Sequence, residues 1–305
     1  MKTWLKIILC FTLVMLLSSC QSSRQLEFPK ADIVYQAGNF IQAQLGFVNA
    51  DGSNLVLLNT DEYFSRPVWS NDGKRLYGLT RSSQAFDLGY PAFWQPGNKY
   101  NDCHQWFNFD QVTDEVILAD GSKHVLIKGA GKILLADLDT CKIADTLVDV
   151  SGQSELLMMG ASYIPNGQLL LYGLQIGQVD FGGYHLMKMD MKTRQTIEIG
   201  AGINPSWSPN GKQIAYVQID GIYVMNRDGT QPRQVHMFTF TKPSDGQIST
   251  PAPMPRWSPD GNWLVYQRCN KNECSLFEHT IYKLEISTGI EIEIVSGGVF
   301  PDWKK

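Results

Sequence analysis

The stretch Pro255-Arg-Trp257-Ser-Pro-Asp260-Gly261-Asn-Trp-Leu-Val-Tyr266 has two close copies elsewhere in the sequence. These copies are Pro67-Val-Trp69-Ser-Asn-Asp72-Gly73-Lys-Arg-Leu-Tyr77 and Pro205-Ser-Trp207-Ser-Pro-Asn210-Gly211-Lys-Gln-Ile-Ala-Tyr216. In each copy a short run ends at the tryptophan, a polar turn with glycine follows, and an apolar run begins. Each copy therefore predicts two short strands joined by a tight turn.

Weaker copies extend this stretch into a repeat. A degenerate copy runs from Tyr163 to Tyr172, a weaker one from Ala119 to Leu126, and the chain ends on Pro301-Asp-Trp303. With Ile117 in the tryptophan position of the weak copy, the copies fall at 69, 117, 163, 207, 257 and 303, which gives gaps of 48, 46, 44, 50 and 46 residues. A period of about 40 to 50 residues with many short strands is typical of the blades of a β-propeller.

A second sequence motif occupies the rest of each unit. Ile222-Tyr-Val-Met-Asn-Arg-Asp228-Gly229-Thr230 reads as a strand followed by an Asp-Gly turn, and Leu45 to Ser53 is nearly the same phrase. Residues 133–140, 185–193 and 281–289 fill the same position in their units. Each unit therefore predicts four strands. We expect its tryptophan to pack between neighbouring blades, because so large a ring must be buried.

The alternation of these two motifs resembles the TolB-type β-propeller repeat over roughly residues 31–305. The resemblance implies an all-β fold that serves as a binding platform or as an accessory domain of enzymes. TolB-type proteins carry an additional α/β domain, for which residues 21–30 leave no room. At about 47 residues per unit, we expect a single propeller of six four-stranded blades. Strands from about Ile33 to Leu58 and a last strand from Val299 to Trp303 would share one blade and close the ring.

The first twenty residues have the pattern of an export signal. Lys2 and Lys6 precede an apolar run over residues 7–17, which is too short to span a bilayer. Leu17-Ser-Ser-Cys20 resembles the lipobox of bacterial lipoproteins, which implies cleavage before Cys20 and acylation of its sulfur and amine. We therefore expect a signal peptide at 1–19, a lipid-anchored tether at 20–30 and the propeller at 31–305. Because Gln21 is not the Asp associated with inner-membrane retention, we expect the periplasmic side of the outer membrane where the host has one.

Composition limits the classes of function. The 305 residues are 43% hydrophobic and 18% charged, which favours a folded globular body. The formal net charge of −4 argues against a nucleic-acid partner, which requires a basic surface. We expect a monomer without a cofactor.

The cysteines predict disulfides rather than a metal site. Cleavage removes Cys10 and lipidation uses Cys20, so four cysteines remain. Cys269 and Cys274 enclose a polar, turn-prone segment and are predicted to pair, which leaves Cys103 and Cys141 to each other by elimination. There is no Cys-x-x-Cys pair and the five histidines are scattered, so we expect no metal.

Four long connections, expected on one rim of the propeller, mark the predicted binding face: Ser82–His104, Gln175–Tyr184, Met237–Pro255 and Arg268–His279. Eight aromatic residues lie between Ser82 and Asp110, with Tyr90 and Trp94 as possible stacking surfaces for a sugar or an apolar partner. Alternatively, half of these aromatic side chains belong to the core. The candidate binding residues are Phe86, Asp87, Tyr90, Trp94, Asp180, Phe181, Lys242, Arg268 and His279.

No catalytic motif is found in the sequence. It contains no Gly-x-Ser-x-Gly, no His-Glu-x-x-His and no Gly-x-x-x-x-Gly-Lys, and Gly129-Ala-Gly131 and Gly200-Ala-Gly202 read as turns. The leading hypothesis is a non-enzymatic, lipid-anchored platform for a protein or peptide of the cell envelope. The alternatives are a carbohydrate-binding surface lipoprotein that uses residues 82–110, and a propeller lyase or hydrolase with a funnel site.

Overall fold

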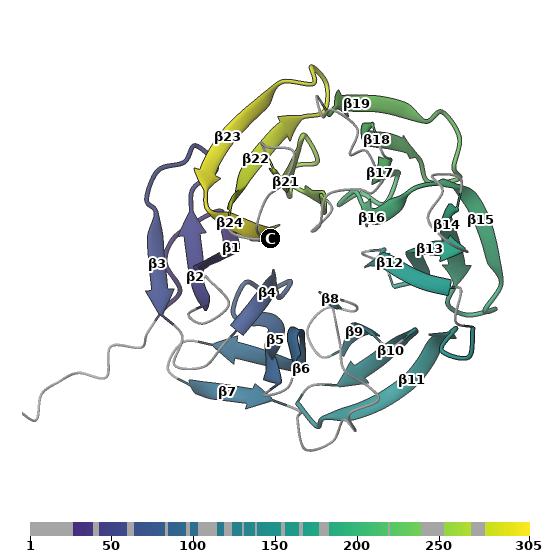
Figure 1. Cartoon of the computed structure of the whole chain (residues 1–305), viewed down its shortest axis with the longest axis horizontal. Helices are drawn as coiled ribbons and strands as arrows, with labels where there is room; N and C mark the ends of the chain where they lie inside the picture. Colours follow the sequence, from purple (N-terminus) through teal and green to yellow (C-terminus); the bar gives the residue numbers. More distant parts are fainter. Residues whose placement is uncertain are drawn as a thin grey trace, which may run out of the picture.

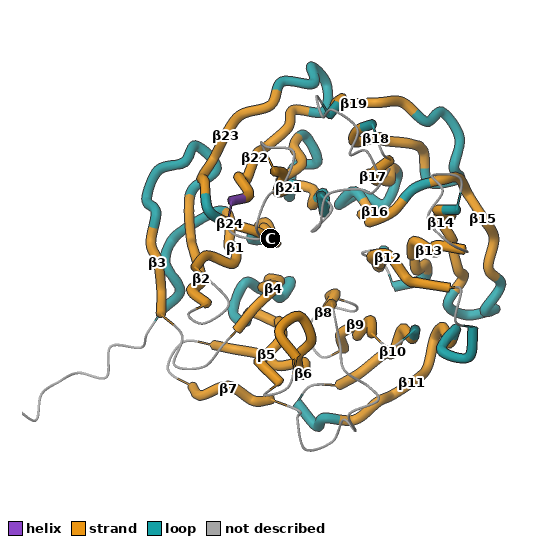
Figure 2. The backbone as a smooth tube through the Cα atoms, viewed as in Figure 1, coloured by secondary structure: helices purple, strands orange, loops and turns teal. Residues whose placement is uncertain are grey.

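The computed structural model describes a chain built almost entirely from β-strands joined by loops (Figure 2). It describes residues 27–38, 43–59, 64–82, 85–95, 98–102, 115–118, 124–129, 131–137, 139–153, 156–164, 167–176, 183–218, 220–238, 253–269 and 278–305. In these ranges, no helix has the length and apolar character needed to cross a membrane. The signal peptide and Cys20, which the sequence predicts, lie outside them.

Within the described residues, the strands form six four-stranded sheets, in each of which neighbouring strands are antiparallel. The first sheet, which we call the shared sheet, contains β24 (Gly298–Trp303), β1 (Ile33–Gly38), β2 (Ala43–Val48) and β3 (Val56–Asn59). The second contains β4 (Phe64–Trp69), β5 (Leu76–Ser82), β6 (Ala85–Gln95) and β7 (Asn98–Asp102). The third contains β8 (Glu115–Leu118), β9 (His124–Gly129), β10 (Lys132–Asp137) and β11 (Lys142–Asp149).

The other three sheets follow in chain order. They consist of β12 (Leu156–Tyr163), β13 (Leu169–Ile176), β14 (Tyr184–Asp190) and β15 (Thr196–Ala201); β16 (Ile203–Trp207), β17 (Gln213–Gln218), β18 (Gly221–Asn226) and β19 (Arg233–Met237); and β20 (Arg256–Trp257), β21 (Trp263–Cys269), β22 (His279–Glu285) and β23 (Glu291–Ser296). Figure 1 shows the sheets arranged around a central axis, with β4, β8, β12, β16 and β24 on the inner side. The all-β propeller fold predicted from the sequence is therefore confirmed.

The shared sheet joins the two ends of the described chain. β24 pairs antiparallel with β1, with Ile33 opposite Trp303 and Val34 opposite Asp302. The Lys304 amide donates a hydrogen bond to the Asp32 carbonyl at 2.7 Å. The buried Asp302 carboxylate accepts a hydrogen bond from the Trp69 amide of the next sheet at 2.8 Å. The last strand is thus bonded both within its own sheet and to its neighbour.

The repeated spacing of the Trp-Ser-x-Asp/Asn-Gly copies has a local physical cause. In the turn after Trp257, the buried Ser258 hydroxyl accepts a hydrogen bond from the Trp263 amide at 3.0 Å, and Asp260 accepts one from the Asn262 amide at 3.1 Å. Gly261 has a φ of +73°, which favours glycine. The turns at Ser70–Arg75 and Ser208–Gln213 have equivalent bonds. The motif residues Trp69, Asp72, Gly73, Trp207, Asn210, Gly211, Trp257, Asp260, Gly261 and Trp303 are therefore structural.

The motif tryptophans pack between neighbouring sheets, as expected. The Trp257 indole N–H donates to the Ser206 carbonyl at 3.0 Å, and that of Trp303 donates to the Arg256 carbonyl at 3.1 Å. Trp69 is fully buried in a cluster with Phe47 of the shared sheet and Leu76 of its own sheet. Each ring thus fills the space between two sheets.

The expected long connection at Ser82–His104 is wrong over most of its length, because β6 and β7 occupy residues 85–95 and 98–102. The reason is an alternating apolar pattern, in which Phe86, Leu88, Tyr90, Ala92 and Trp94 recur at every second position. Ala92 is buried in the cluster around Trp69, and half-buried Trp94 packs against the same cluster. Trp94, expected as a stacking surface, is therefore a packing residue. Trp106, Phe107 and Phe109, which the core interpretation of this segment places at strand-like spacing, lie outside the described residues.

Two of the four cysteines available for disulfides lie in the described residues. Cys141 in the turn between β10 and β11, and Cys269 at the end of β21, are each disulfide-bonded. Cys103 and Cys274 lie outside the described residues, so the two pairings remain predictions.

Candidate binding site at the axis of the propeller

The residues before three of the four motif prolines occupy a special backbone position on the inner strands. Arg66, Asn204 and Phe300, which precede Pro67, Pro205 and Pro301, have φ angles of 51°, 50° and 53°, and Gly160 of β12 has a φ of 71°. The pairing register between inner and second strand shifts next to each of these residues. Left-handed backbone at a non-glycine residue costs about 1–3 kcal/mol and clusters at functional sites. This repeated bulge therefore marks a candidate site.

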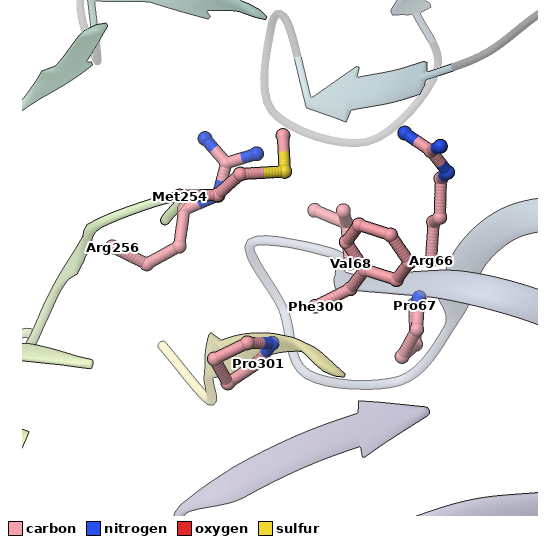
Figure 3. A pocket seen from close by; sticks show the side chains of 7 residues that line it. All are labelled: Arg66, Pro67, Val68, Met254, Arg256, Phe300 and Pro301. Atoms are coloured by element: carbon pink, nitrogen blue, oxygen red, sulfur yellow. The ribbon is translucent and has the colours of Figure 1, made fainter. Parts of the chain in front are cut away.

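The bulged residues line a hollow at the propeller axis, which we call the axial hollow. It is a shallow hollow with a cavity volume of about 20 Å³. Its lining residues come from three sheets: Arg66, Pro67, Val68, Met254, Arg256, Phe300 and Pro301 (Figure 3). A narrow crevice, too small to admit a water molecule, shares Met254 and Arg256 and extends to Gly160 and Asn204.

Two arginines give the axial hollow its charge. In Figure 3, Arg66 and Arg256 lie on opposite sides of the hollow with Phe300 between them. The Arg66 guanidinium lies over the Phe300 ring, 4.4 Å from its centroid. In the described part of the chain, Arg66 forms no ion pair with a carboxylate. A guanidinium held on an aromatic face is arranged to bind a carboxylate through two parallel hydrogen bonds.

Asp302 is the acidic residue next to this hollow. Burial raises the pKa of its carboxyl, while the charges of Lys305 and Arg256 and the hydrogen bonds from Trp69 and Trp303 oppose the rise. Its side chain is buried and bonded to the Trp69 amide. Asp302 is therefore part of the contact between two sheets.

The strand register places the axial hollow on one face of the ring. Arg66 lies near the start of β4, where Phe64 pairs with Thr80 near the end of β5. Asn204 lies at the equivalent place in β16, where Ile203 pairs with Val217 near the end of β17. The second strands end on this face, and the inner strands begin there. The hollow therefore lies on the face where the connections predicted to bind a partner begin and end.

Of the nine candidate binding residues, only Trp94, Arg268 and His279 have described side chains, and none of these three lines the hollow. Phe86, Asp87 and Tyr90 are on β6, and the structure does not describe their side chains. Asp180, Phe181 and Lys242 lie outside the described residues. The Trp94 ring meets the Phe28 ring edge-on, 5.1 Å between centroids. It is thus a packing residue and not an open stacking platform.

Arg268 and His279 correct the prediction that both are polar residues of an exposed rim. His279 is the first residue of β22, pairs with Cys269 and is fully buried. Arg268 binds Glu291 of β23 through two hydrogen bonds of 2.9 and 2.6 Å and lies 4.4 Å over the Tyr282 ring. The strands β21 and β22 extend further into this segment than expected, which turns both side chains into internal groups.

Glu291 is the centre of a buried polar cluster between two sheets. Its carboxylate accepts hydrogen bonds from Arg268 and the Tyr266 hydroxyl and lies 3.3 Å from Nε2 of His236 on β19. Burial raises the pKa of Glu291, but the bonds from Arg268 and Tyr266 outweigh it, so the pKa is lower than usual. Burial lowers the pKa of His236 despite the nearby carboxylate. We assign this cluster a structural role because it joins the β16–β19 and β20–β23 sheets.

Sequence reasoning missed Arg66, Met254, Arg256 and Phe300. The signal that could have found them is their position directly before or after a motif proline. Each of these prolines lies two residues before a buried tryptophan, so the neighbours of the proline recur at the same place in each unit. In the described ranges, no three side chains of His, Cys, Asp or Glu gather as a metal site would require.

Comparison with solved structures defines the chain as a β-propeller protein, while no family model matches its sequence. It is similar to TolB from Acinetobacter baumannii, with a TM-score of 0.66 and 15% identity over 90% of this chain and 67% of that one. A putative TolB from Agrobacterium tumefaciens gives a TM-score of 0.59 and 16% identity over 88% and 91% of the two chains. A chain of the nidogen/laminin complex gives a TM-score of 0.63 and 8% identity over 90% of this chain and 98% of that one. The resemblance to TolB-type repeats is thus confirmed at the level of the fold.

Proposed function

We propose that this chain is a lipid-anchored β-propeller of the cell envelope that binds a protein or peptide partner without catalysing a reaction. Residues 1–19 are its signal peptide, Cys20 carries the lipid, residues 20–30 are a tether, and residues 31–305 form a closed ring of six blades. The lipobox-like segment supports the anchor. The fold also occurs in a nidogen/laminin complex, which is a precedent for association with a partner.

The axial hollow carries this proposal. It combines the guanidinium groups of Arg66 and Arg256 with the apolar surfaces of Val68, Met254 and Phe300. An acidic group next to an apolar side chain, as in an acidic peptide segment, matches this combination of charge and apolar surface. The strained backbone at Arg66 and Phe300 holds the site in place before the partner arrives.

Replacement of Arg66 tests the role of the hollow. We expect Arg66→Glu to lower recovery of the partner roughly 10- to 100-fold, because a charge-assisted hydrogen bond contributes about 1.5–3 kcal/mol and each 1.4 kcal/mol is tenfold in affinity. The measurement is crosslinking in intact envelopes, followed by purification of the propeller and quantification of the captured proteins.

Lys192→Glu is the matched control, because this substitution changes the charge by the same amount. Lys192 lies in the exposed turn between β14 and β15. Equal capture by wild type and Arg66→Glu would exclude the axial hollow as the binding site. Capture of background proteins alone by the wild type, across several growth conditions, would contradict partner binding itself.

A further inference from the structure

The outer strand of the shared sheet differs from the outer strands of the other sheets. β3 and its flanks read Asn54-Leu-Val-Leu-Leu-Asn59 and contain no charged residue. Each of the other outer strands, β7, β11, β15, β19 and β23, contains at least one Lys, Arg, Asp or Glu. Charged residues on an edge strand prevent it from pairing with other chains or aggregating. β3 lacks this protection.

Three consecutive apolar side chains at the start of β3 are exposed. Leu55, Val56 and Leu57 are 50%, 37% and 48% exposed, and we call these three residues the β3 strip. β3 pairs with β2 on one side and is the outer edge of its sheet on the other. A run of exposed aliphatic side chains without charge is typical of a surface that contacts another apolar phase.

The N-terminal part of the described chain packs against the same cluster as Leu58, the residue after this strip. The Phe28 ring lies 4.9 Å from the Trp69 ring and 6.0 Å from the Phe47 ring. Leu58, which directly follows the β3 strip, packs against the same cluster as Phe28. The chain therefore enters the propeller at the side of the shared sheet that carries Leu58.

The length of the tether sets how far this side can be from the lipid. Glu27, the first described residue, is seven residues after Cys20. Because an extended chain spans at most about 3.6 Å per residue, these seven steps cover no more than about 25 Å. A lipid on Cys20 therefore keeps the entry point of the chain, with the shared sheet, close to the membrane surface.

We propose that the β3 strip contacts the lipid bilayer next to the anchor and orients the propeller on the membrane. This inference rests on the proposed lipidation of Cys20. Aliphatic side chains on an edge without charges can enter the boundary between headgroups and acyl chains, and a second point of contact makes anchoring by lipid more durable. It also limits the rotation of the ring, so that the axial hollow keeps a constant orientation to the membrane.

Photocrosslinking to lipid tests this inference. The full lipoprotein is produced with its own signal, with p-benzoylphenylalanine at position 57 or at position 197. Ile197 is the matched control because it is 53% exposed on β15, the outer strand of a sheet across the ring from the shared sheet (Figure 1). Each protein is reconstituted in vesicles of phosphatidylethanolamine and phosphatidylglycerol, irradiated, and analysed by intact-mass spectrometry. We expect at least five times more phospholipid adduct at position 57 than at 197.

The possible outcomes separate this inference from the proposed function. Equal adduct yields at the two positions on an acylated chain would overturn the membrane contact and leave the anchor intact. Crosslinks from position 57 to a second copy of the chain, without lipid adducts, would show edge pairing instead. An intact mass without acylation at Cys20 would overturn both the anchor and the membrane contact. The same substitution at position 55 repeats the test at a second site, and thermal melting shows whether each variant is folded.

Discussion

Deletion of residues 298–305 is expected to unfold the propeller or to lower its melting temperature by at least about 10 °C. These residues include all of β24, whose Val299, Phe300 and Trp303 side chains are buried. Each such side chain contributes about 1.5–3 kcal/mol through burial, so the loss is about 4.5–9 kcal/mol, which is comparable with the whole stability of many domains. A change of 1 kcal/mol shifts the melting temperature of a domain of this size by about 2–4 °C.

The deletion also opens the ring. Without β24, the buried residues Ile33 and Val34 of β1 lose their neighbouring strand, and the Trp69 amide loses the Asp302 carboxylate. Thermal melting followed by circular dichroism measures the effect, with deletion of the exposed Lys305 alone as the control. A cooperative transition at the wild-type temperature would disprove closure of the ring by β24.

Glu291→Ala is expected to destabilise the protein by about 3–5 kcal/mol. The substitution removes the carboxylate that accepts two hydrogen bonds from the Arg268 guanidinium, whose side chain is only 18% exposed. It also removes the partner of the buried Tyr266 hydroxyl. Chemical denaturation measures the free energy of unfolding. Glu293→Ala on the same strand is the control, because Glu293 is exposed, and its expected effect is within about 0.5 kcal/mol.

A double variant distinguishes the ion pair from simple loss of packing. If Arg268 is costly only because its charge is left buried, Glu291→Ala combined with Arg268→Leu should be more stable than Glu291→Ala alone. If the double variant loses as much unfolding free energy as the two single variants together, the two side chains act independently.

The same cluster makes the stability of the protein depend on pH. Burial lowers the pKa of His236 below its ordinary 6.5, so the contribution of the neutral imidazole is complete above pH 6.5 and is lost as the pH falls through the lower folded value. The pKa of Glu291 is lowered from 4.5, so its contribution is lost further down, below pH 4.5. Both effects reduce stability in acid. We expect Glu291→Gln to abolish the loss of unfolding free energy below pH 4.5. Denaturation curves measured between pH 3 and 8 test this.

Much of the ring follows from short-range interactions and could be predicted from the sequence. The Ser258 and Asp260 side chains bond to amides within five residues, and Gly261 supplies the positive φ of the turn. Such turns form wherever these residue types occur at this spacing, so their copies reveal the period and hence the propeller. The aromatic segment at 82–104 was harder to predict, because an apolar alternation fits both a strand and a binding surface.

The sequence by itself determined the repeat, the turns and the burial of the motif tryptophans between sheets, because each depends on residues close together in the chain. Only the tertiary structure decided which side chains meet at the axis. Arg66 lies over Phe300 from the other end of the chain because the ring closes, and Arg268 meets Glu291 because β21 and β23 belong to one sheet. The side on which the chain enters the shared sheet has the same cause, since Phe28 and Leu58 pack against one cluster only in the folded core.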